Sequence, residues 1–513
     1  MCIPGSTFFG GGGGGIEIMP TALPVNYPEM VVEKSEGLTA SERKLAALGY
    51  QTFLRLWSYP NPYKLQPNGK ELCDLLVVFD NHIIIFSDKD CVYGNSGNPK
   101  VDWRRWYKRA IQKSAEQLIG AKNWISRYPD RIAVDAKCSK KLPLEIKITA
   151  ETKFHLIAIA HGATEPCKKY FAGGDGGLIV DSSIVGDMHI NEDCEPFYIG
   201  RVFNEPQTFI HVFDDASYIN VLHELDTIQD FLRYLEARQK LFVTKHVIAE
   251  SESDILAQHL QGVMKGNPRI LQEICKTHTD IYFEGELFEE LKCSPAYAEW
   301  HNKIKKSYFW DELLQKTFFF IENGLSATTT SPTIQDQSEL FKLMAREDRF
   351  HRYALSEGFL SFLAKIDPDQ RGTRILFNGD EPEVCYILFL LPRKEYMSDA
   401  GYRQLRKEML MDYCCIVKAE YPEVLHIIGV AHESSEGQYT SEDFIYLDAR
   451  KWSKEQQAEA LKLKQEYETH GMLAKRTTIP RTFYPDKPKM KGRDRNKPCP
   501  CGSGKKFKNC CGK

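Results

Sequence analysis

The sequence predicts an α/β protein of two domains that ends in a small cysteine-rich module. The chain has 513 residues, which is more than one hydrophobic core usually accommodates. Apolar runs of strand length alternate with segments in which apolar residues recur at helical spacing. Four of the 15 cysteines fall in the last turn-rich segment of the chain, which suggests a separate small module there.

The composition is that of a globular protein, with 42% hydrophobic and 27% charged residues, and it excludes a disordered, collagen-like or fibrous chain. No apolar run is long enough for a membrane span, and the N-terminus lacks the layout of a secretory signal. We therefore expect a cytoplasmic protein with no membrane partner. The net charge of −3 conceals a basic tail, because residues 475–513 carry 13 Lys and Arg against 2 Asp and Glu. Such a tail indicates contact with a polyanion or simple solvation.

The first domain is expected over residues 38–245, after a disordered N-terminus at 1–37 that contains six consecutive glycines and several prolines. Thr39 is followed by Glu42 and then by apolar residues at helical spacing, which predicts a capped helix. The apolar runs and helical periods that follow predict strands at 72–79 and 83–87 joined by a tight turn at 80–82, a helix at 101–127, strands at 153–160 and 209–213, and a helical segment at 222–242.

A second α/β domain is expected over residues 246–470, followed by a basic linker at 471–496 and the cysteine module at 497–513. This second domain shows no catalytic grouping of residues, and we interpret it as a recognition domain. After mixed helical segments, its patterns predict strands at 374–377 and 384–391, a helix at 399–421, strands at 426–431 and 443–447, and a helix at 453–468.

The four cysteines of the tail suit tetrahedral Zn²⁺, and a glycine-rich turn between the two pairs lets the chain fold back. The module has one large apolar side chain, Phe507, so metal binding must supply most of its folding free energy. Two disulfides or reactive thiols are the alternative, which a reducing compartment disfavours. The expected zinc ligands are Cys499, Cys501, Cys510 and Cys511.

The run CPCGSGKKFKNCC resembles the zinc-binding SEC-C motif, which is found at the C-terminus of the SecA translocation ATPase and is appended to many other bacterial proteins. The resemblance implies a docking module for a protein or ribosome partner. It covers about 20 residues, and the rest of the chain lacks the G-x-x-x-x-G-K-[ST] loop of an ATPase. The activity of this chain must therefore lie elsewhere.

Acidic residues and a lysine gather at the ends of the first two expected strands. Asp74 begins one strand shortly after Glu71, and Asp88 and Lys89 end the next. In an antiparallel hairpin these positions lie side by side. Carboxylates that bind Mg²⁺ or Mn²⁺, together with a lysine, suit metal-assisted hydrolysis of nucleic-acid phosphodiester bonds. Charged strand ends at a solvated sheet edge are the alternative.

This grouping resembles the PD-(D/E)xK nuclease superfamily, particularly its Mrr- and NERD-like branches, and the resemblance implies a mixed-sheet, restriction-endonuclease-like domain. It assigns Glu42 as the acid of the first helix, Asp74 as the central metal ligand, Lys89 as the lysine and Gln117 as the helix glutamine. The whole-chain hypothesis is then a metal-dependent nuclease with a role in bacterial defence, the latter by analogy alone.

One position departs from this family's pattern, because Ser87 stands two residues before Lys89 where the family has an acid. Side chains alternate along a strand, so Ser87 and Lys89 share a face and Asp88 is expected to point away. Either Glu71 or Asp88 replaces the missing carboxylate as a magnesium ligand, or the site is degraded. In the latter case the protein is a non-catalytic adaptor that binds nucleic acid or a protein.

The helix after the hairpin interleaves basic residues with Trp103, Trp106 and Tyr107, a pattern that suits contact with a nucleic-acid backbone. The alternative is a half-buried helix whose aromatic side chains pack inward while its charges are solvated. The expected nucleic-acid contacts are Arg104, Arg105, Lys108, Arg109 and Lys113. We interpret the strand histidines His155, His161 and His211 as core or surface residues and not as ligands.

Overall fold

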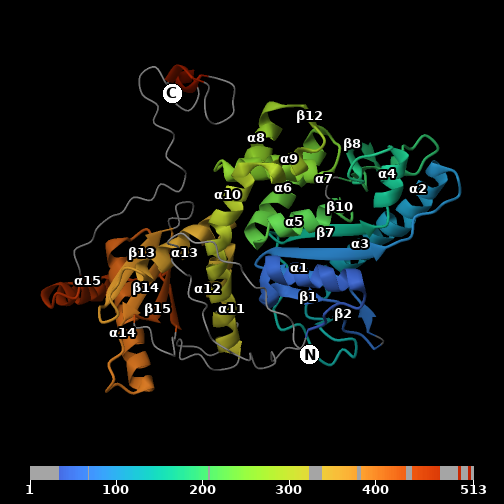
Figure 1. Cartoon of the computed structure of the whole chain (residues 1–513). Helices are drawn as coiled ribbons and strands as arrows, with labels where there is room; N and C mark the ends of the chain where they lie inside the picture. Colours follow the sequence, from blue (N-terminus) through green and yellow to red (C-terminus); the bar gives the residue numbers. More distant parts are fainter. Residues whose placement is uncertain are drawn as a thin grey trace. The chain divides into compact units, whose positions relative to one another are not determined.

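The computed structural model describes residues 34–67, 69–205, 208–322, 338–377, 383–434, 442–473, 495–497 and 506–509. The described strands form one five-stranded sheet, two four-stranded sheets and one three-stranded sheet, with helices between them (Figure 1). The predicted α/β class is therefore confirmed.

The first sheet has the strand order β1-β4-β5-β7-β10. Its strands are β1 (Ser58–Pro60), β4 (Leu75–Phe79), β5 (His82–Asp90), β7 (Lys153–His161) and β10 (Ile210–Phe213). β1 pairs antiparallel with β4 and β4 antiparallel with β5, whereas β5, β7 and β10 run parallel. The predicted hairpin is confirmed, and Asp80 in its turn has a φ of 56°, a conformation that Asp tolerates.

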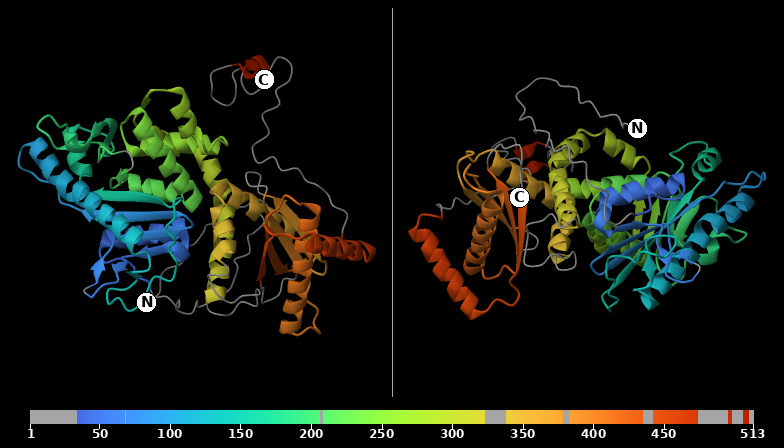
Figure 2. Two further views of the ribbon diagram at one scale, coloured as in Figure 1. Left: turned by 180° about the vertical axis from the view of Figure 1, so that it is seen from behind. Right: turned by 90° about the horizontal axis from the view of Figure 1, so that it is seen from below.

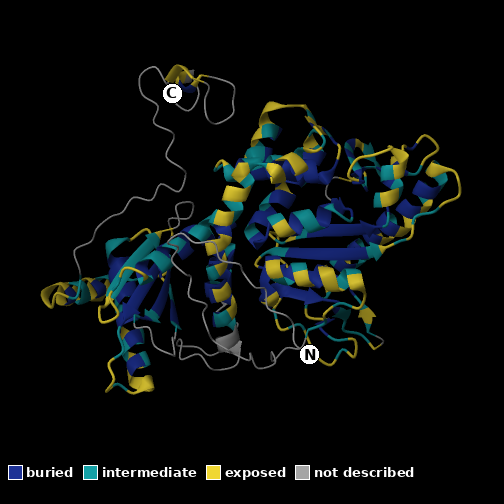
Figure 3. Ribbon diagram, viewed as in Figure 1, coloured by how far each residue is buried: buried dark blue, intermediate teal, exposed yellow. Residues whose placement is uncertain are grey.

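Helices cover both faces of this sheet, whose strands are largely buried (Figure 3). These helices are α1 (Ala40–Trp57), α2 (Pro99–Tyr107), α3 (Lys113–Arg127), α5 (Ser217–Glu224) and α6 (Ile228–Thr244). Phe53 of α1 and Phe231 of α6 pack on Phe86 of β5. The next residue of β5, Ser87, points to the opposite face and contacts Gln117 of α3. A π-helical turn at Lys108–Gln112 joins α2 to α3, so the predicted long helix is confirmed with one irregular turn.

The second sheet has the order β12-β11-β8-β9. Its strands are β8 (Ile179–Val185), β9 (Tyr198–Arg201), β11 (His246–Ala249) and β12 (Asp280–Phe283), and α4 (Thr164–Tyr170) precedes β8. The predicted domain boundary at residue 245 falls between α6 and β11. Because β11 pairs with β8, the segments on the two sides of that boundary share one sheet. A small sheet of β2 (Tyr63–Lys64), β3 (Lys70–Glu71) and β6 (Ile132–Ala133) lies beside the first strands.

A run of helices follows, and buried ion pairs join it to the first part of the chain. These helices are α7 (Glu252–Met264), α8 (Ile270–Thr277), α9 (Leu287–Cys293), α10 (Pro295–Ile304), α11 (Tyr308–Glu322), α12 (Ser338–Arg346) and α13 (Arg349–Leu363). The buried guanidinium of Arg349 bonds Asp226 before α6 and Asp311 of α11, each at 2.8 Å. The helices α7–α13 therefore pack as an extension of the first domain.

The third sheet has the order β13-β14-β15-β16 and closely matches the prediction for residues 374–468. Its elements are β13 (Gly372–Phe377), β14 (Val384–Leu391), α14 (Asp399–Glu420), β15 (His426–Glu433), β16 (Glu442–Asp448) and α15 (Lys454–Thr469). α14 packs on the sheet, and α15 packs against α14 through Tyr413 and Tyr467 (Figure 2). On the sheet's other face Tyr386 contacts Trp310 of α11 and donates a hydrogen bond to Glu347.

Part of the expected disordered N-terminus belongs to the fold, since the Nζ of Lys34 lies 3.9 Å from the centre of the Tyr59 ring. The four tail cysteines, Cys499, Cys501, Cys510 and Cys511, lie outside the described residues. The glycine-rich turn between them also lies outside the described residues. Near them, the backbone N–H of the buried Phe507 donates to the carbonyl of Lys497 at 2.9 Å. No helix in the described ranges is long and apolar enough to cross a bilayer.

Candidate active site

Asp74 lies at the start of β4 with only 5% of its surface exposed. Its Oδ2 accepts a hydrogen bond from the backbone N–H of Asp88 and lies 3.9 Å from the Nζ of Lys89. Burial raises the pKa of Asp74 to about 7, and the positive charge of Lys89 only partly opposes this. The site therefore holds a carboxylate whose ionised form is poorly compensated by the protein alone.

Asn61 connects three of the predicted acids. Its side-chain amide donates to Glu42 Oε2 at 2.8 Å and to Glu71 Oε1 at 2.9 Å, and its backbone N–H donates to the carbonyl of Asp74 at 3.0 Å. Asn61 is fully buried with a φ of 45°, which asparagine tolerates better than most residues. Sequence reasoning missed this residue, and its only signal was its place in the turn between Pro60 and Pro62.

The protein lowers the pKa of Glu42 but raises that of Asp74. Burial disfavours the ionised form of Glu42, but hydrogen bonds from Asn61 and from the backbone of Leu38 outweigh it and lower the pKa of Glu42. The charges of Glu71 and Glu42 both raise the pKa of Asp74. Repulsion among these groups is the electrostatic condition that a bound cation relieves.

The predicted alternation along β5 is confirmed. The hydroxyl of Ser87 donates to Gln117 Oε1 at 3.2 Å on one face, whereas Oδ1 of Asp88 lies 2.5 Å from Nε2 of His161 on the other. Of the two carboxylates offered as replacements for the missing acid, Asp88 is engaged by a histidine across the sheet. Glu71 is the one whose charge acts on Asp74.

His161 at the end of β7 lies between two carboxylates, a feature that sequence reasoning missed. Its Nδ1 is 2.7 Å from Oδ1 of Asp215, whose other oxygen accepts from the hydroxyl of Thr164 and the backbone N–H of Gly162. Burial disfavours a charged imidazole, but the hydrogen bonds to Asp215 and Asp88 raise the pKa of His161 to about 10. This imidazolium holds the end of β5, and with it Lys89, against β7.

The helix that was predicted to bind nucleic acid is amphipathic, and its aromatic side chains pack inward as the alternative interpretation expects. Trp103, Trp106 and Tyr107 are buried, and the two indole N–H groups donate to the carbonyls of His189 and His161. Those rings are therefore unavailable for stacking on bases. Of the five predicted basic contacts, Arg104 is half-buried and the exposed ones are Arg105, Lys108, Arg109 and Lys113.

The groups around Asp74 are carboxylates, the oxygen ligands that Mg²⁺ prefers in proteins. Three carboxylates face a single lysine, and Mg²⁺ is commonly held by one or two carboxylates with water completing its shell. Among the described residues, the ligand atoms of Glu42, Glu71 and Asp74 do not all lie within 4.8 Å of one another. These three carboxylates therefore do not form a three-ligand site in this arrangement.

Comparison with known proteins confirms the C-terminal motif. A family model described as the SEC-C motif matches residues 495–513. The protein translocase subunit SecA of Geobacter sulfurreducens is 33% identical over 122 residues, 24% of this chain and 10% of that protein. SecA of Finegoldia magna is 70% identical over 30 residues, 6% of this chain and 3% of that protein. The chain thus spans a small fraction of these relatives, and no solved structure matches it.

Proposed function

We propose that the chain is a metal-dependent nuclease that carries a zinc-binding docking module. The observation behind the proposal is the buried Asp74, whose pKa is raised to about 7, beside Lys89 and within the field of Glu42 and Glu71. A strongly perturbed acid with a specific charged partner is typical of a functional site.

The order of elements supports the same proposal. A helix precedes three antiparallel strands, β1, β4 and β5, and a helix then leads to the parallel strand β7. This mixed sheet agrees with the restriction-endonuclease-like fold that the motif implied. Asp74 and Lys89 lie on neighbouring strands of it, and Gln117 comes from the helix that covers their face.

The residues at the proposed site would each have a different role in the reaction. A divalent ion held there would polarise the phosphate and lower the pKa of an attacking water. Asp74 and Glu71 would hold that ion, and Asn61 fixes Glu71 and Glu42 by its two amide hydrogen bonds. The ammonium of Lys89 would bind the phosphate oxygen that gains charge. The exposed cations of α2, of the π-helical turn after it and of the start of α3 would bind the nucleic-acid backbone without reading its sequence.

The SEC-C tail would bind one Zn²⁺ through Cys499, Cys501, Cys510 and Cys511 and dock the chain on a protein partner. The support is the match of residues 495–513 to the motif and the likeness of short stretches of the chain to SecA, a translocase subunit. The return of the chain from Phe507 to Lys497 agrees with a turn that brings the two cysteine pairs together.

The test is cleavage of single- and double-stranded DNA and RNA with Mg²⁺ or Mn²⁺. Asp74→Asn and Lys89→Met should each lower the rate at least about 100-fold, since each removes a group that acts on the reacting phosphate. Asp90→Asn, which changes the exposed acid next along β5, is the matched control and should keep full activity. Equal rates in all four proteins would remove Asp74 and Lys89 from any mechanism.

A non-catalytic adaptor is the second candidate, and the bond between Ser87 and Gln117 favours it. There a neutral hydrogen bond occupies the place of the expected acid. If the site is degraded in this way, wild type should bind nucleic acid without cleaving it, and Ser87→Asp should gain metal-dependent cleavage. If wild type already cleaves, the adaptor hypothesis is wrong.

A further inference from the structure

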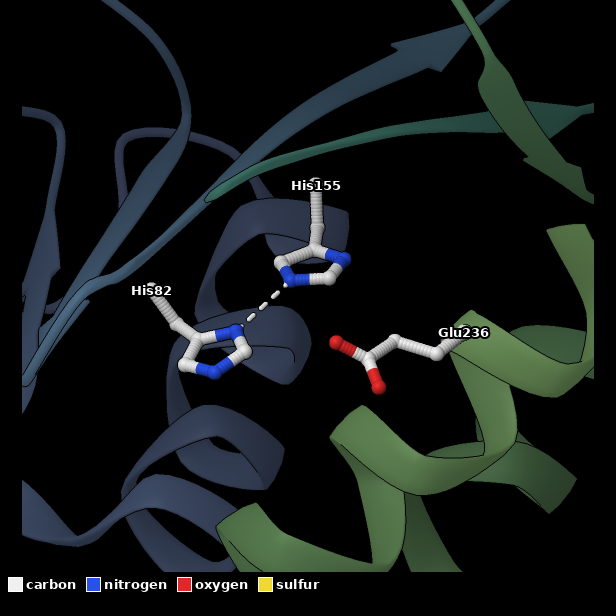
Figure 4. A group of neighbouring side chains, drawn as sticks. All are labelled: His82, His155 and Glu236. Carbon is white, nitrogen blue, oxygen red and sulfur yellow. Dashed lines mark hydrogen bonds between the residues drawn. The ribbon is translucent and has the colours of Figure 1, made fainter. Parts of the chain in front are cut away.

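Two histidines and a glutamate come together at the end of the first sheet opposite to Lys89 (Figure 4). His82 opens β5, His155 lies on β7, and Glu236 reaches toward them from α6. Their ligand atoms all lie within 4.8 Å of one another, and no other set of three or more His, Cys, Asp or Glu side chains does so in the described part of the chain. None of the three residues takes part in the candidate active site.

The spacing of the two imidazoles is close to that of a metal site. Nδ1 of His82 and Nε2 of His155 are 2.9 Å apart. Two nitrogens at 2.0–2.1 Å from a tetrahedral Zn²⁺ are separated by about 3.3 Å. If small side-chain rotations moved these two nitrogens about 0.4 Å further apart, the ion would fit between them.

Burial acts on both imidazoles. It lowers the pKa of His155 to about 3 and also lowers that of His82. The Nδ1 of His155 is buried, and the described residues offer it no partner. When Nε2 of His155 is the free nitrogen of the ring, the proton is on Nδ1. The free-energy cost of burying that N–H is then the same whether Nε2 accepts a hydrogen bond from His82 or binds a metal.

The carboxylate of Glu236 lies near both the histidines and a lysine. One of its oxygens is within 4.8 Å of the ligand nitrogens of both histidines, and its Oε1 pairs with the Nζ of Lys153 at 2.6 Å. Glu236 is exposed and His82 half-buried, so water has access to complete the coordination shell. Lys153 neutralises part of the negative charge, and it therefore opposes a cation at this place.

We propose that His82, His155 and Glu236 bind one divalent transition-metal ion, with Zn²⁺ as the natural occupant, and that the ion ties α6 to β5 and β7. Imidazole nitrogen with a single carboxylate oxygen is a donor set that zinc prefers and magnesium does not. This site is independent of the proposed nuclease site and of the tail cysteines. It leaves a coordination position for water, as catalytic zinc sites do.

The experiment uses the full chain, stripped of metal by a chelator and titrated with Zn²⁺ and then with Co²⁺. Because the tail is also expected to bind zinc, the two sites must be distinguished by the number of zinc ions bound per chain and by the Co²⁺ absorption spectrum. His82→Ala should hold one zinc ion fewer per chain than wild type. It should also lose the visible Co²⁺ bands of a nitrogen and oxygen site while retaining the thiolate charge-transfer bands of the tail.

Three further variants make the assignment specific. Glu236→Gln, at an exposed position that should not disturb folding, should weaken binding at this site at least about 10-fold. Lys153→Met should tighten it about fivefold, because it removes a positive charge close to the ion. His278→Ala removes an exposed histidine elsewhere and should change nothing.

Three results would each overturn the proposal. Equal zinc content and equal Co²⁺ spectra in wild type and His82→Ala would show an ordinary hydrogen-bonded histidine pair. Unchanged affinity in Glu236→Gln, or weaker binding in Lys153→Met, would contradict the three-ligand site. A rise in melting temperature with Zn²⁺ that is present in wild type and absent in both ligand variants would support it.

Discussion

The buried carboxylate of Asp74 is the residue on which the proposed activity depends, and its raised pKa has a measurable cost. The unfolded chain ionises this group near pH 4, whereas the folded protein does so only near pH 7. Each pKa unit corresponds to about 1.4 kcal/mol, so the metal-free protein should lose a few kcal/mol between these two pH values.

Asp74→Asn should therefore stabilise the metal-free protein. The gain should grow as the pH rises from 4 to 7 and stay constant above 7, because the variant has no charge to bury. Melting temperatures of both proteins at pH 5 and pH 8, in a chelator, measure it. Asp90→Asn is the control. A variant that is less stable than wild type at pH 8 would show that the charge of Asp74 is well compensated.

His161 changes the stability of the protein with pH in the favourable direction. The pKa of its imidazole is about 10 in the folded protein, above its value near 6.5 in the unfolded chain. Its contribution to stability is complete below pH 6.5 and is lost as the pH rises through 10. His161→Gln should cost about 3 kcal/mol at pH 7, since it leaves Asp88 and Asp215 without their shared cation. Urea denaturation at pH 7 and pH 10.5 should show the difference shrinking, and His278→Gln should show none.

Sequence alone anticipated some of these residue environments and not others. The two-residue period of a strand was enough to place Asp88 away from Ser87 and Lys89. It did not reveal Asn61, or the approach of His161 to Asp215. His161 and Asp215 are 54 positions apart, and Asn61 joins elements 10 and 19 positions away on either side of it. No local pattern records which loop closes over which strand end.

At the scale of elements, the start of α6 shows how a local signal fixes a boundary. Thr227 precedes the helix, accepts a hydrogen bond from the backbone N–H of Asp230 at 3.1 Å and donates one to its carboxylate at 2.7 Å. α6 carries both Phe231 of the core and Glu236 of the proposed metal site, so its start helps to set the register of both.

Thr227→Ala should destabilise the protein by about 1–2 kcal/mol, because it leaves an N-terminal amide of α6 without its acceptor. Thr227→Ser keeps the hydroxyl and should recover most of that loss. Chemical denaturation of the three proteins measures it. Equal losses in the Ala and Ser variants would indicate that packing of the threonine methyl matters and that the cap does not.

The elements that were predicted best are those with the strongest local pattern. The buried strand β14 is a run of apolar residues, and Ser453 caps α15 in a reciprocal arrangement with Gln456. The irregular turn between α2 and α3 was not predictable. In it the N–H of Lys113 reaches the carbonyl of Lys108, and the composition of the turn does not differ from that of an ordinary helix.

At the scale of the whole molecule, the tail is expected to behave as a unit that folds by itself on zinc. Removal of residues 474–513 should leave the melting temperature of the remaining chain within about 1–2 °C, because the metal stabilises only the module that binds it. Differential scanning calorimetry of the full and shortened chains checks this. A drop of several degrees would show that the module packs on the rest of the protein.

The division into domains is where sequence reasoning was weakest. The order of the expected strands and helices placed the end of the first domain at residue 245, and the structure has a helix before that position and a strand after it. The pairing of β11 with β8 depends on contacts between segments more than sixty positions apart. Arg349 likewise meets Asp226 across 123 positions. No periodicity within one segment encodes such partners.

The pairing of β8 with β11 determines how this chain can be cut. A fragment ending at residue 245 would keep β9 beside β8 but remove β11 from its other side, and the unpaired amide and carbonyl groups would form an edge that invites aggregation. The complementary fragment would begin with β11, which would keep β12 as a neighbour but lose β8. Inactivity of such a fragment would therefore reflect a damaged fold. A fragment that keeps both the β8–β11 pairing and the acidic partners of Arg349 must extend beyond α13.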